Sequence, residues 1–295
     1  MSEFLIETHG LRRHYKNVRA VDGLNLSVPR GSLCGFLGRN GAGKTTTIKM
    51  LLGMTRTDAG EGSIFGYPID TETGSLEIRR RTGYVSETKE LYPFMSVAQM
   101  IRFTRSFYPG WRKDLEEKYL KLFTLPPDRP IPKLSKGMRT QLMLLLALAR
   151  APELLILDEP TEGLDPAMIE MALEALVGIA GELGTTVFFS SHQLGEVEQI
   201  ADRICIIHAG RAVIGGELDE IKSRYKRIQF ALDGAASETE LAVGPEEHLH
   251  REGRTVAICT GEDPGAIVER ARTVGACAIE VFPMSLKEIF LEYAR

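Results

Sequence analysis

The sequence predicts an α/β protein built on a mainly parallel sheet, with an antiparallel β region before it and a small α+β region after it. Strand-like and helix-like segments alternate from Glu153 to about Gly215, which is typical of parallel strands joined by helices. Apolar and polar residues alternate over the opening segment, which favours short antiparallel strands. From Lys226 onward, a second strand and helix pattern indicates a separate α+β appendage.

Composition excludes several classes of protein. The 295 residues are 43% hydrophobic and 26% charged, which excludes a collagenous, coiled-coil or largely disordered chain. The net charge of −4 lacks the basic excess of a general nucleic-acid binder, so no nucleic-acid partner is expected. The longest apolar run, residues 142–149, is well short of the roughly 20 residues of a membrane span. With no signal-peptide pattern at Met1, we expect a cytoplasmic chain that reaches a membrane through a partner.

The chain is expected to divide into two domains. Residues 1–215 form the larger one, and a mainly helical subdomain occupies about residues 88–150 of it. Residues 216–225 are expected to be a linker, and residues 226–295 a small α+β domain.

A glycine-rich segment between an apolar strand and a helix fits the pattern G-x-x-x-x-G-K-[ST]. Such a loop wraps a polyphosphate because glycines let backbone N–H groups approach closely and adopt positive φ angles. The lysine adds a positive charge at the β and γ phosphates, and the hydroxyl that follows it can bind Mg²⁺. The pattern therefore predicts a nucleoside-triphosphate site of the P-loop type. Its residues are Gly38, Asn40, Gly41, Gly43, Lys44 and Thr45.

Two carboxylates follow the apolar segment 154–157. At the carboxyl end of a parallel strand they would face the ligand crevice. Asp158 could then hold Mg²⁺, while Glu159 could polarise a water in line with the γ-phosphate. On its own, the pair is explained equally well as a solvated turn.

Three further segments, in this order along the chain, identify a family. They are LSKGM (134–138), GLD (163–165) and SSH (190–192), and with the two sites above they resemble the nucleotide-binding subunit of ABC transporters from about Leu5 to Gly215. The resemblance implies that Tyr15 stacks on adenine, that Thr46 extends the phosphate loop, and that His192 contacts the γ-phosphate. It also implies that Asp158 holds Mg²⁺, that Glu159 is the general base, that Ser135 and Gly137 complete the site of another protomer, and that Asp165 connects the two sites.

The resemblance implies ATP and Mg²⁺ as cofactors and a head-to-tail dimer that encloses two ATP molecules. The second subunit would be another copy of the chain or a paralogous ATPase. Physical chemistry supports that arrangement, because a helix beginning near Gly137 behind the Ser135 hydroxyl is a second anion-binding feature. One chain thus offers two anion-binding features, the glycine loop and the helix start at Ser135, but only one phosphate site. In a dimer with a two-fold axis, the glycine loop of each chain would face the helix start of the other. Integral-membrane permease subunits are expected to hold the dimer at the inner face of the cell membrane.

The sequence departs from the family pattern at two places. Lys136 and Met138 replace the glycine and glutamine of the usual LSGGQ signature, and Glu87 stands where the family commonly has glutamine. Glu87 still offers an oxygen to Mg²⁺, so we expect it to be a metal ligand. These features resemble a bacterial branch whose ATPases pair with separate multi-helix permeases, often in export.

Two other functions compete with that of an ATPase that powers a transporter. A regulatory ATP-dependent clamp of the same family is the alternative, although such relatives generally carry two cassettes or a long coiled-coil insertion, which this chain lacks. A small-molecule kinase is disfavoured because it has no use for LSKGM or His192. The transported substance belongs to the permease and is not encoded here. The pair His248 and His250 lies in a polar stretch without a third ligand, so we expect solvated loop residues there.

Overall fold

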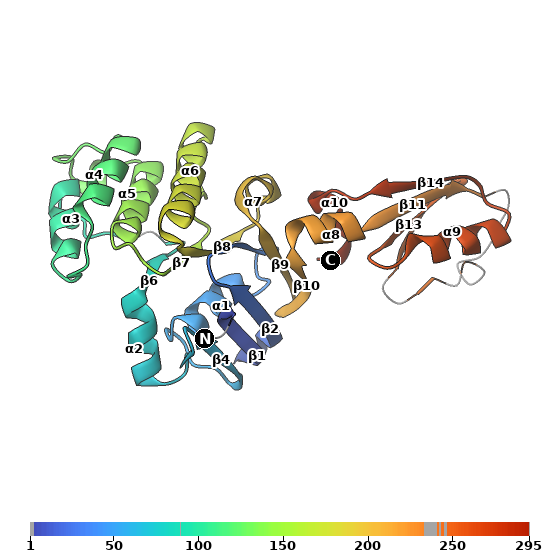
Figure 1. Ribbon diagram of the computed structural model, residues 1–295, viewed down its shortest axis with the longest axis horizontal. Coiled ribbons are helices and arrows are strands. Elements are labelled where there is room, and N and C mark those ends of the chain that lie inside the picture. The colour runs from blue at the N-terminus through green and yellow to red at the C-terminus, as the bar shows by residue number, and fades with distance from the viewer. Residues whose placement is uncertain (1–2, 89, 233–240, 242, 245–246, 295) are drawn as a thin grey trace. The chain divides into compact units, whose positions relative to one another are not determined.

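The computed structural model describes residues 3–88, 90–232, 241, 243–244 and 247–294. The chain forms two compact units, Met1–Ile214 and Gly215–Arg295 (Figure 1). The predicted α/β class, with its antiparallel, helical and α+β parts, is confirmed.

The N-terminal unit begins with an antiparallel sheet in the order β2-β1-β4-β5. Its two long strands alternate buried and exposed residues, as the sequence pattern predicts. Their apolar faces pack into the main core of this unit. The strands are β1 (Phe4–Tyr15), β2 (Val18–Pro29), β4 (Ala59–Ile64) and β5 (Tyr67–Pro68).

The central sheet has the order β10-β9-β3-β8-β7-β6, and β9, β3, β8, β7 and β6 pair in parallel. Every residue of β7 and β8 is buried, which is typical of parallel strands covered on both faces. The glycine loop, the acidic pair and the SSH segment follow β3, β7 and β8, so they meet at one edge of the sheet. The strands are β3 (Leu33–Leu37), β6 (Thr82–Val85), β7 (Leu154–Asp158), β8 (Thr186–Ser191), β9 (Arg203–His208) and β10 (Arg211–Glu217).

Four helices of this unit, α2, α3, α5 and α6, start at side chains that accept hydrogen bonds from first-turn N–H groups. Ser96, Ser135 and Asp165 cap α3, α5 and α6 in this way, and Gly184 ends α6 at a φ of 67°. Helices α3, α4 and α5 lie together, drawn in green in Figure 1, and occupy most of the predicted helical subdomain. The helices are α1 (Lys44–Leu51), α2 (Glu72–Arg81), α3 (Val97–Arg105), α4 (Lys113–Leu122), α5 (Lys136–Leu148), α6 (Pro166–Leu183) and α7 (Leu194–Ile200), with a 3₁₀ turn at Ile131–Lys133. Throughout the described chain, each helix is too short or too polar to cross a bilayer.

The C-terminal unit has a core of its own. Its four-stranded sheet, in the order β12-β13-β11-β14, is antiparallel throughout. Phe230 and Ile258 point to one face of this sheet and pack against Ile267 and Ala271 of α9. The elements are α8 (Leu218–Arg224), β11 (Lys226–Ala231), β12 (His248–Glu252), β13 (Thr255–Thr260), α9 (Pro264–Thr273), β14 (Cys277–Pro283) and α10 (Leu286–Tyr293).

Residues 216–225, expected as a linker, include the end of β10 and helix α8, with Leu218 and Ile221 buried. One expectation for this part of the chain is wrong. His248 and His250 are not loop residues, because they lie in β12 and pair with β13. An edge strand tolerates polar residues, which explains why its composition resembled that of a loop.

The fold predicts a large effect of truncating the centre of β7. Ile156 is fully buried, so Ile156→Ala should lower the free energy of unfolding by about 2–5 kcal/mol through lost apolar contacts and a cavity. This change in the free energy of unfolding can be measured by urea unfolding, monitored through the fluorescence of Trp111, the single tryptophan. Val177→Ala, at a side chain that is 47% exposed, is the control and should stay within about 0.5 kcal/mol. Equal values for the two variants would contradict the assigned core.

Candidate nucleotide-binding site

A pocket of about 570 Å³ opens at the carboxyl ends of the central strands. Residues from the glycine loop, from the start of α1 and from the segments after β6, β7 and β8 line it. The structure therefore brings together most of the residues that the sequence singled out for phosphate, metal and catalysis. These are Asn40, Gly41, Gly43, Lys44, Thr45, Thr46, Glu87, Glu159 and His192, with Val18, Ala20, Arg39 and Glu162 completing the lining.

The glycine loop has the geometry that binding a polyphosphate requires. Gly41 and Gly43 have φ angles of 82° and 109°, a region that favours glycine. A Cβ atom on Gly43 would lie 2.2 Å from the carbonyl oxygen of Ala20, and one on Gly38 would lie 2.8 Å from that of Ile207. Helix α1 begins at Lys44, immediately after this loop, so its first N–H groups add to the anion-binding surface.

Lys44 and Glu159 form a buried ion pair at the base of the pocket. The ammonium of Lys44 donates to the carbonyl oxygen of Gly38 at 2.7 Å and lies 3.1 Å from Glu159 Oε1. The other oxygen of Glu159 lies 2.8 Å from Nδ1 of His192. Lys44 and Glu159 are each 6% exposed, so little water screens their charges. This arrangement holds the predicted phosphate lysine, general base and γ-phosphate histidine together in one chain of contacts.

Ser190 joins the Asp158 carboxylate to the backbone of Glu159, a role that the sequence analysis missed. Its hydroxyl donates to Asp158 Oδ1 at 2.7 Å and accepts from the N–H of Glu159 at 3.0 Å. Glu159 itself has a φ of 48°, a left-handed backbone conformation that is uncommon for residues other than glycine. Only the position of Ser190 in SSH, at the end of the neighbouring strand, could have revealed this role.

The donor set fits Mg²⁺. Asp158 is fully buried, and its Oδ2 atom has no hydrogen-bond partner among the described residues. A buried carboxylate oxygen without a donor is stabilised by a cation or by water. Thr45 and Glu87 contribute further oxygens to the same region, and oxygen ligands are those that Mg²⁺ prefers. Burial, aided by the charges of Asp158 and then of Glu87, raises the pKa of Tyr84 to about 12, which is consistent with acidic groups gathered here.

A further acid lies behind the site. Burial raises the pKa of Glu196, and the charge of Glu159 adds to that effect. The Thr161 hydroxyl donates to Glu196 Oε2 at 2.5 Å. The sequence analysis missed this pair because the two residues are 35 positions apart, and only the position of Glu196 four residues after His192 hinted at a role.

Six predicted residues are not among those that line this pocket. Gly38 and Asp158 belong to the loop and the strand end described above, and the other four lie elsewhere. Ser135 and Asp165 cap α5 and α6 by accepting from Met138 and Met168 N–H groups, at 3.1 and 3.0 Å. Gly137 lies in the first turn of α5, and α5 belongs to the helical group that Figure 1 draws apart from α1.

Tyr15 also lies outside the lining, and its ring already has contacts within the chain. Its hydroxyl lies 3.3 Å from Thr55 Oγ1, and the Arg13 guanidinium lies 4.6 Å from the ring centre. The roles given to Tyr15, Ser135, Gly137 and Asp165 stay predictions.

Comparisons with known proteins agree with this geometry. The family model described as ABC transporter matches residues 21–162. The chain is 36% identical to the bacitracin transport ATP-binding protein BcrA of Bacillus licheniformis over 83% of this chain and 79% of that one. It is 33% identical to the Nod factor export ATP-binding protein I of Burkholderia orbicola over 99% of this chain and 97% of that one. A solved ATP-binding subunit of an ABC transporter is 31% identical, with a TM-score of 0.68 over 74% of this chain and 92% of that one.

The fold and the site thus define a P-loop ATPase domain. The chain belongs to the ABC transporter family and is one of its ATP-binding proteins. The family resemblance drawn from LSKGM, the acidic pair and SSH is therefore confirmed.

The glycine loop predicts a sharp effect of one added methyl group. Gly43→Ala places Cβ against the Ala20 carbonyl at a strained φ angle, so the loop must move. Strain of this kind costs about 1–3 kcal/mol, so ATP affinity should fall about 5–150-fold in a nucleotide-binding titration. Gly181→Ala in α6 has open space around its Cβ and is the matched control. Undiminished ATP binding by Gly43→Ala would contradict the assigned cradle.

Proposed function

We propose that this chain hydrolyses ATP with Mg²⁺ and that hydrolysis powers an exporter whose membrane channel is made by other chains. The observation that carries the proposal is the contact chain from Lys44 through Glu159 to His192, beside the buried Asp158 carboxylate. Phosphoryl transfer to water needs a positioned water and compensation of phosphate charge, and these side chains can supply both. The name of the Nod factor export relative supports the export direction.

Each residue of the site has a distinct proposed role in the reaction. The cradle at 38–46 binds the triphosphate, and the Lys44 ammonium moves its charge from Glu159 toward the β and γ phosphates. Glu159, freed from that ion pair, accepts a hydrogen bond from the attacking water and orients it. His192 contacts the γ-phosphate and holds the Glu159 carboxylate in place. Mg²⁺, held by Thr45, Asp158 and Glu87, would neutralise charge on the β and γ oxygens.

A second copy of the chain, or a paralogous subunit, would complete the site. Ser135 and Gly137 form a serine-capped helix start on α5, outside the pocket of their own chain. Such a helix start binds anions well, because its N–H groups and its dipole face the ligand. In a head-to-tail dimer each α5 would close the partner's pocket, and loss of the γ-phosphate would open it again.

An exposed aromatic cluster on the helical subdomain is the proposed contact with the permease. Tyr92, Phe94, Phe103 and Phe107 lie in a row with ring centres 5.0–5.6 Å apart, and Phe94 is 76% exposed. Exposed apolar patches of this kind mark protein interaction sites. Phe103 lies in α3 and Phe107 lies just beyond its end, both after Glu87 in the chain, so a permease segment bound here could influence the metal side of the pocket. Through this contact the chain would lie at the inner face of the membrane.

Removing the carboxylate of Glu159 tests the proposed chemistry. Glu159→Gln should keep ATP affinity but lower the rate of phosphate release by roughly 10²–10⁴-fold, the usual effect of losing a general base. A steady-state ATPase assay beside an ATP-binding titration separates the two quantities. Glu174→Gln, at an exposed position of α6, is the control. Normal turnover by Glu159→Gln would refute the assignment.

The Mg²⁺ role of Glu87 has its own test. Glu87→Ala removes one oxygen from the metal side of the pocket, so the Mg²⁺ concentration for half-maximal ATPase should rise. Glu87→Gln keeps an oxygen and should stay much closer to the parent protein. An unchanged rate and an unchanged Mg²⁺ dependence in Glu87→Ala would end the hypothesis.

A further inference from the structure

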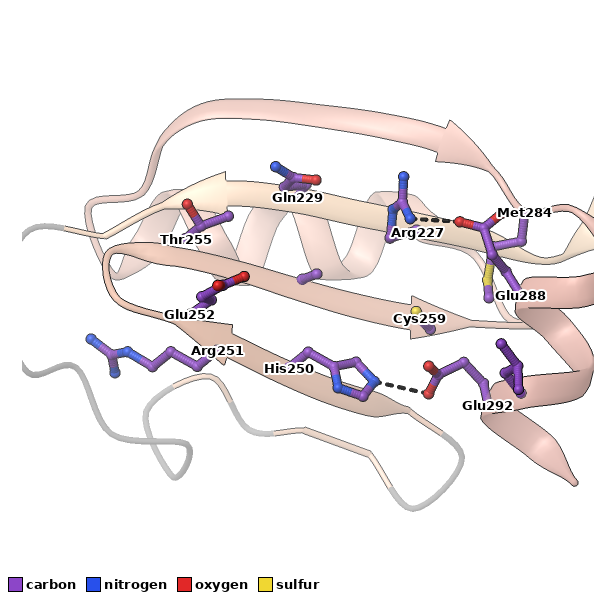
Figure 2. Close-up of a pocket in the computed structure, with 12 residues that line it drawn as sticks. Arg227, Gln229, His250, Arg251, Glu252, Thr255, Cys259, Met284, Glu288 and Glu292 are labelled. Carbon is purple, nitrogen blue, oxygen red and sulfur yellow. Dashed lines mark hydrogen bonds and ion pairs between the residues drawn. The ribbon is translucent and has the colours of Figure 1, made fainter. Parts of the chain in front are cut away.

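The sheet of the C-terminal unit has a second face that the nucleotide site does not use. Strand pairing places Cys259 opposite both Arg227 and His248, and Ala257 opposite both Gln229 and His250. Since side chains alternate along a strand, these residues share the face opposite to α9. A pocket of about 550 Å³ lies over this face, and α10 contributes Glu288, Leu291 and Glu292 to its lining (Figure 2).

Helix α10 is fixed so that it presents a carboxylate to this face. Ser285 and Glu288 form a capping box at its start, and Glu288 also accepts from Arg227 of β11 at 2.6 Å. Glu292 follows Glu288 by four residues and therefore points to the same side of the helix. Figure 2 shows Glu292 directed toward His250 of β12.

Three different ligand types converge at this point. His250 Nε2 lies 2.8 Å from Glu292 Oε2, and Cys259 Sγ completes a set whose ligand atoms all lie within 4.8 Å of one another. Cys259 is 3% exposed, and the Glu292 side chain 13%. A neighbouring imidazole, that of His248, lies 3.4 Å from the same Glu292 oxygen through Nδ1. The third ligand that the H-x-H pair lacks in sequence is thus supplied by β13 and α10.

We propose that His250, Cys259 and Glu292 bind one Zn²⁺ ion in the C-terminal unit. Imidazole nitrogen, thiolate sulfur and carboxylate oxygen are the ligands that Zn²⁺ takes, at about 2.0–2.3 Å in a tetrahedron. Ligand atoms on such an ion lie about 3.3–3.8 Å apart. The widest separations in the set would therefore shorten by about 1 Å, and the 2.8 Å between His250 and Glu292 would lengthen by about 0.5 Å. Mg²⁺ and Ca²⁺ prefer all-oxygen sites, so the sulfur and nitrogen donors select against them.

The fourth position faces the pocket and takes water or, after a ring rotation, His248. Binding converts the Cys259 thiol to a thiolate and releases its proton to solvent, while the imidazole must be neutral. Affinity should therefore fall as the pH is lowered. The ion would tie the edge strand β12, its neighbour β13 and the terminal helix α10 together, which makes it a structural clip.

The experiment is a metal titration of the full, nucleotide-free chain. Calorimetry with Zn²⁺ gives the stoichiometry, and Co²⁺ used as a spectroscopic substitute reports sulfur ligation through its thiolate charge-transfer absorption. We expect one equivalent of Zn²⁺ and a thiolate band with Co²⁺. Cys259→Ser should lose the band, and His250→Ala should weaken Zn²⁺ binding on the order of a hundredfold or more, because even outer-shell changes cost about 10–100-fold.

Matched controls distinguish this site from other thiols and imidazoles. Cys277→Ser, at an exposed cysteine of β14, and His9→Ala, in the N-terminal unit, should leave the band and the Zn²⁺ affinity unchanged. Should Cys259→Ser fail to fold, as judged by circular dichroism, the partly exposed His250→Ala carries the test alone. Absence of Zn²⁺ binding by the parent chain, an unchanged Zn²⁺ affinity in His250→Ala, or loss of the band in Cys277→Ser but not in Cys259→Ser overturns the proposal.

Discussion

The nucleotide site depends on how buried charge is compensated at one edge of a parallel sheet. Asp158 and Glu159 end a fully buried strand, and within the pocket Lys44 is the cation that contacts Glu159. Charges at such positions are tolerated only when partners satisfy them. The Gly38 carbonyl and Ser190 fix the geometry of this group, while the free oxygen of Asp158 leaves a place for a cation. A bound phosphate group would compete with Glu159 for Lys44, which links nucleotide binding to release of the general base.

The residues of this site could be predicted from the sequence because they belong to short contiguous motifs at the ends of strands. Glycines at 38, 41 and 43 are needed where backbone meets backbone or where φ is positive, so their spacing alone identifies a phosphate loop. The acidic pair alone did not indicate a catalytic site, and only its combination with LSKGM and SSH in one sequence did. Ser190 and the Thr161–Glu196 pair could not be predicted, because they act through contacts between segments about 30 residues apart that only the strand order defines.

In the C-terminal unit, by contrast, the sequence did not predict the candidate site. The predicted α+β character of this unit is confirmed, but the polar segment around His248 and His250 is an edge strand rather than a loop. Composition misled the prediction because an edge strand has a solvated side and tolerates charge. The convergence of His250, Cys259 and Glu292 follows from strand register and from the anchoring of α10, neither of which the spacing of these residues reveals. Figure 2 makes that convergence visible.

The central claim is that two chains close over ATP, each supplying its Ser135-capped helix to the pocket of the other. The most direct measurement is the molecular mass of Glu159→Gln in solution, by light scattering, with saturating ATP and Mg²⁺. The account predicts about twice the 32.7 kDa of one chain, and a return toward the single-chain mass when Ser135→Ala is added. A strictly monomeric Glu159→Gln, both alone and beside its membrane partner, would contradict it.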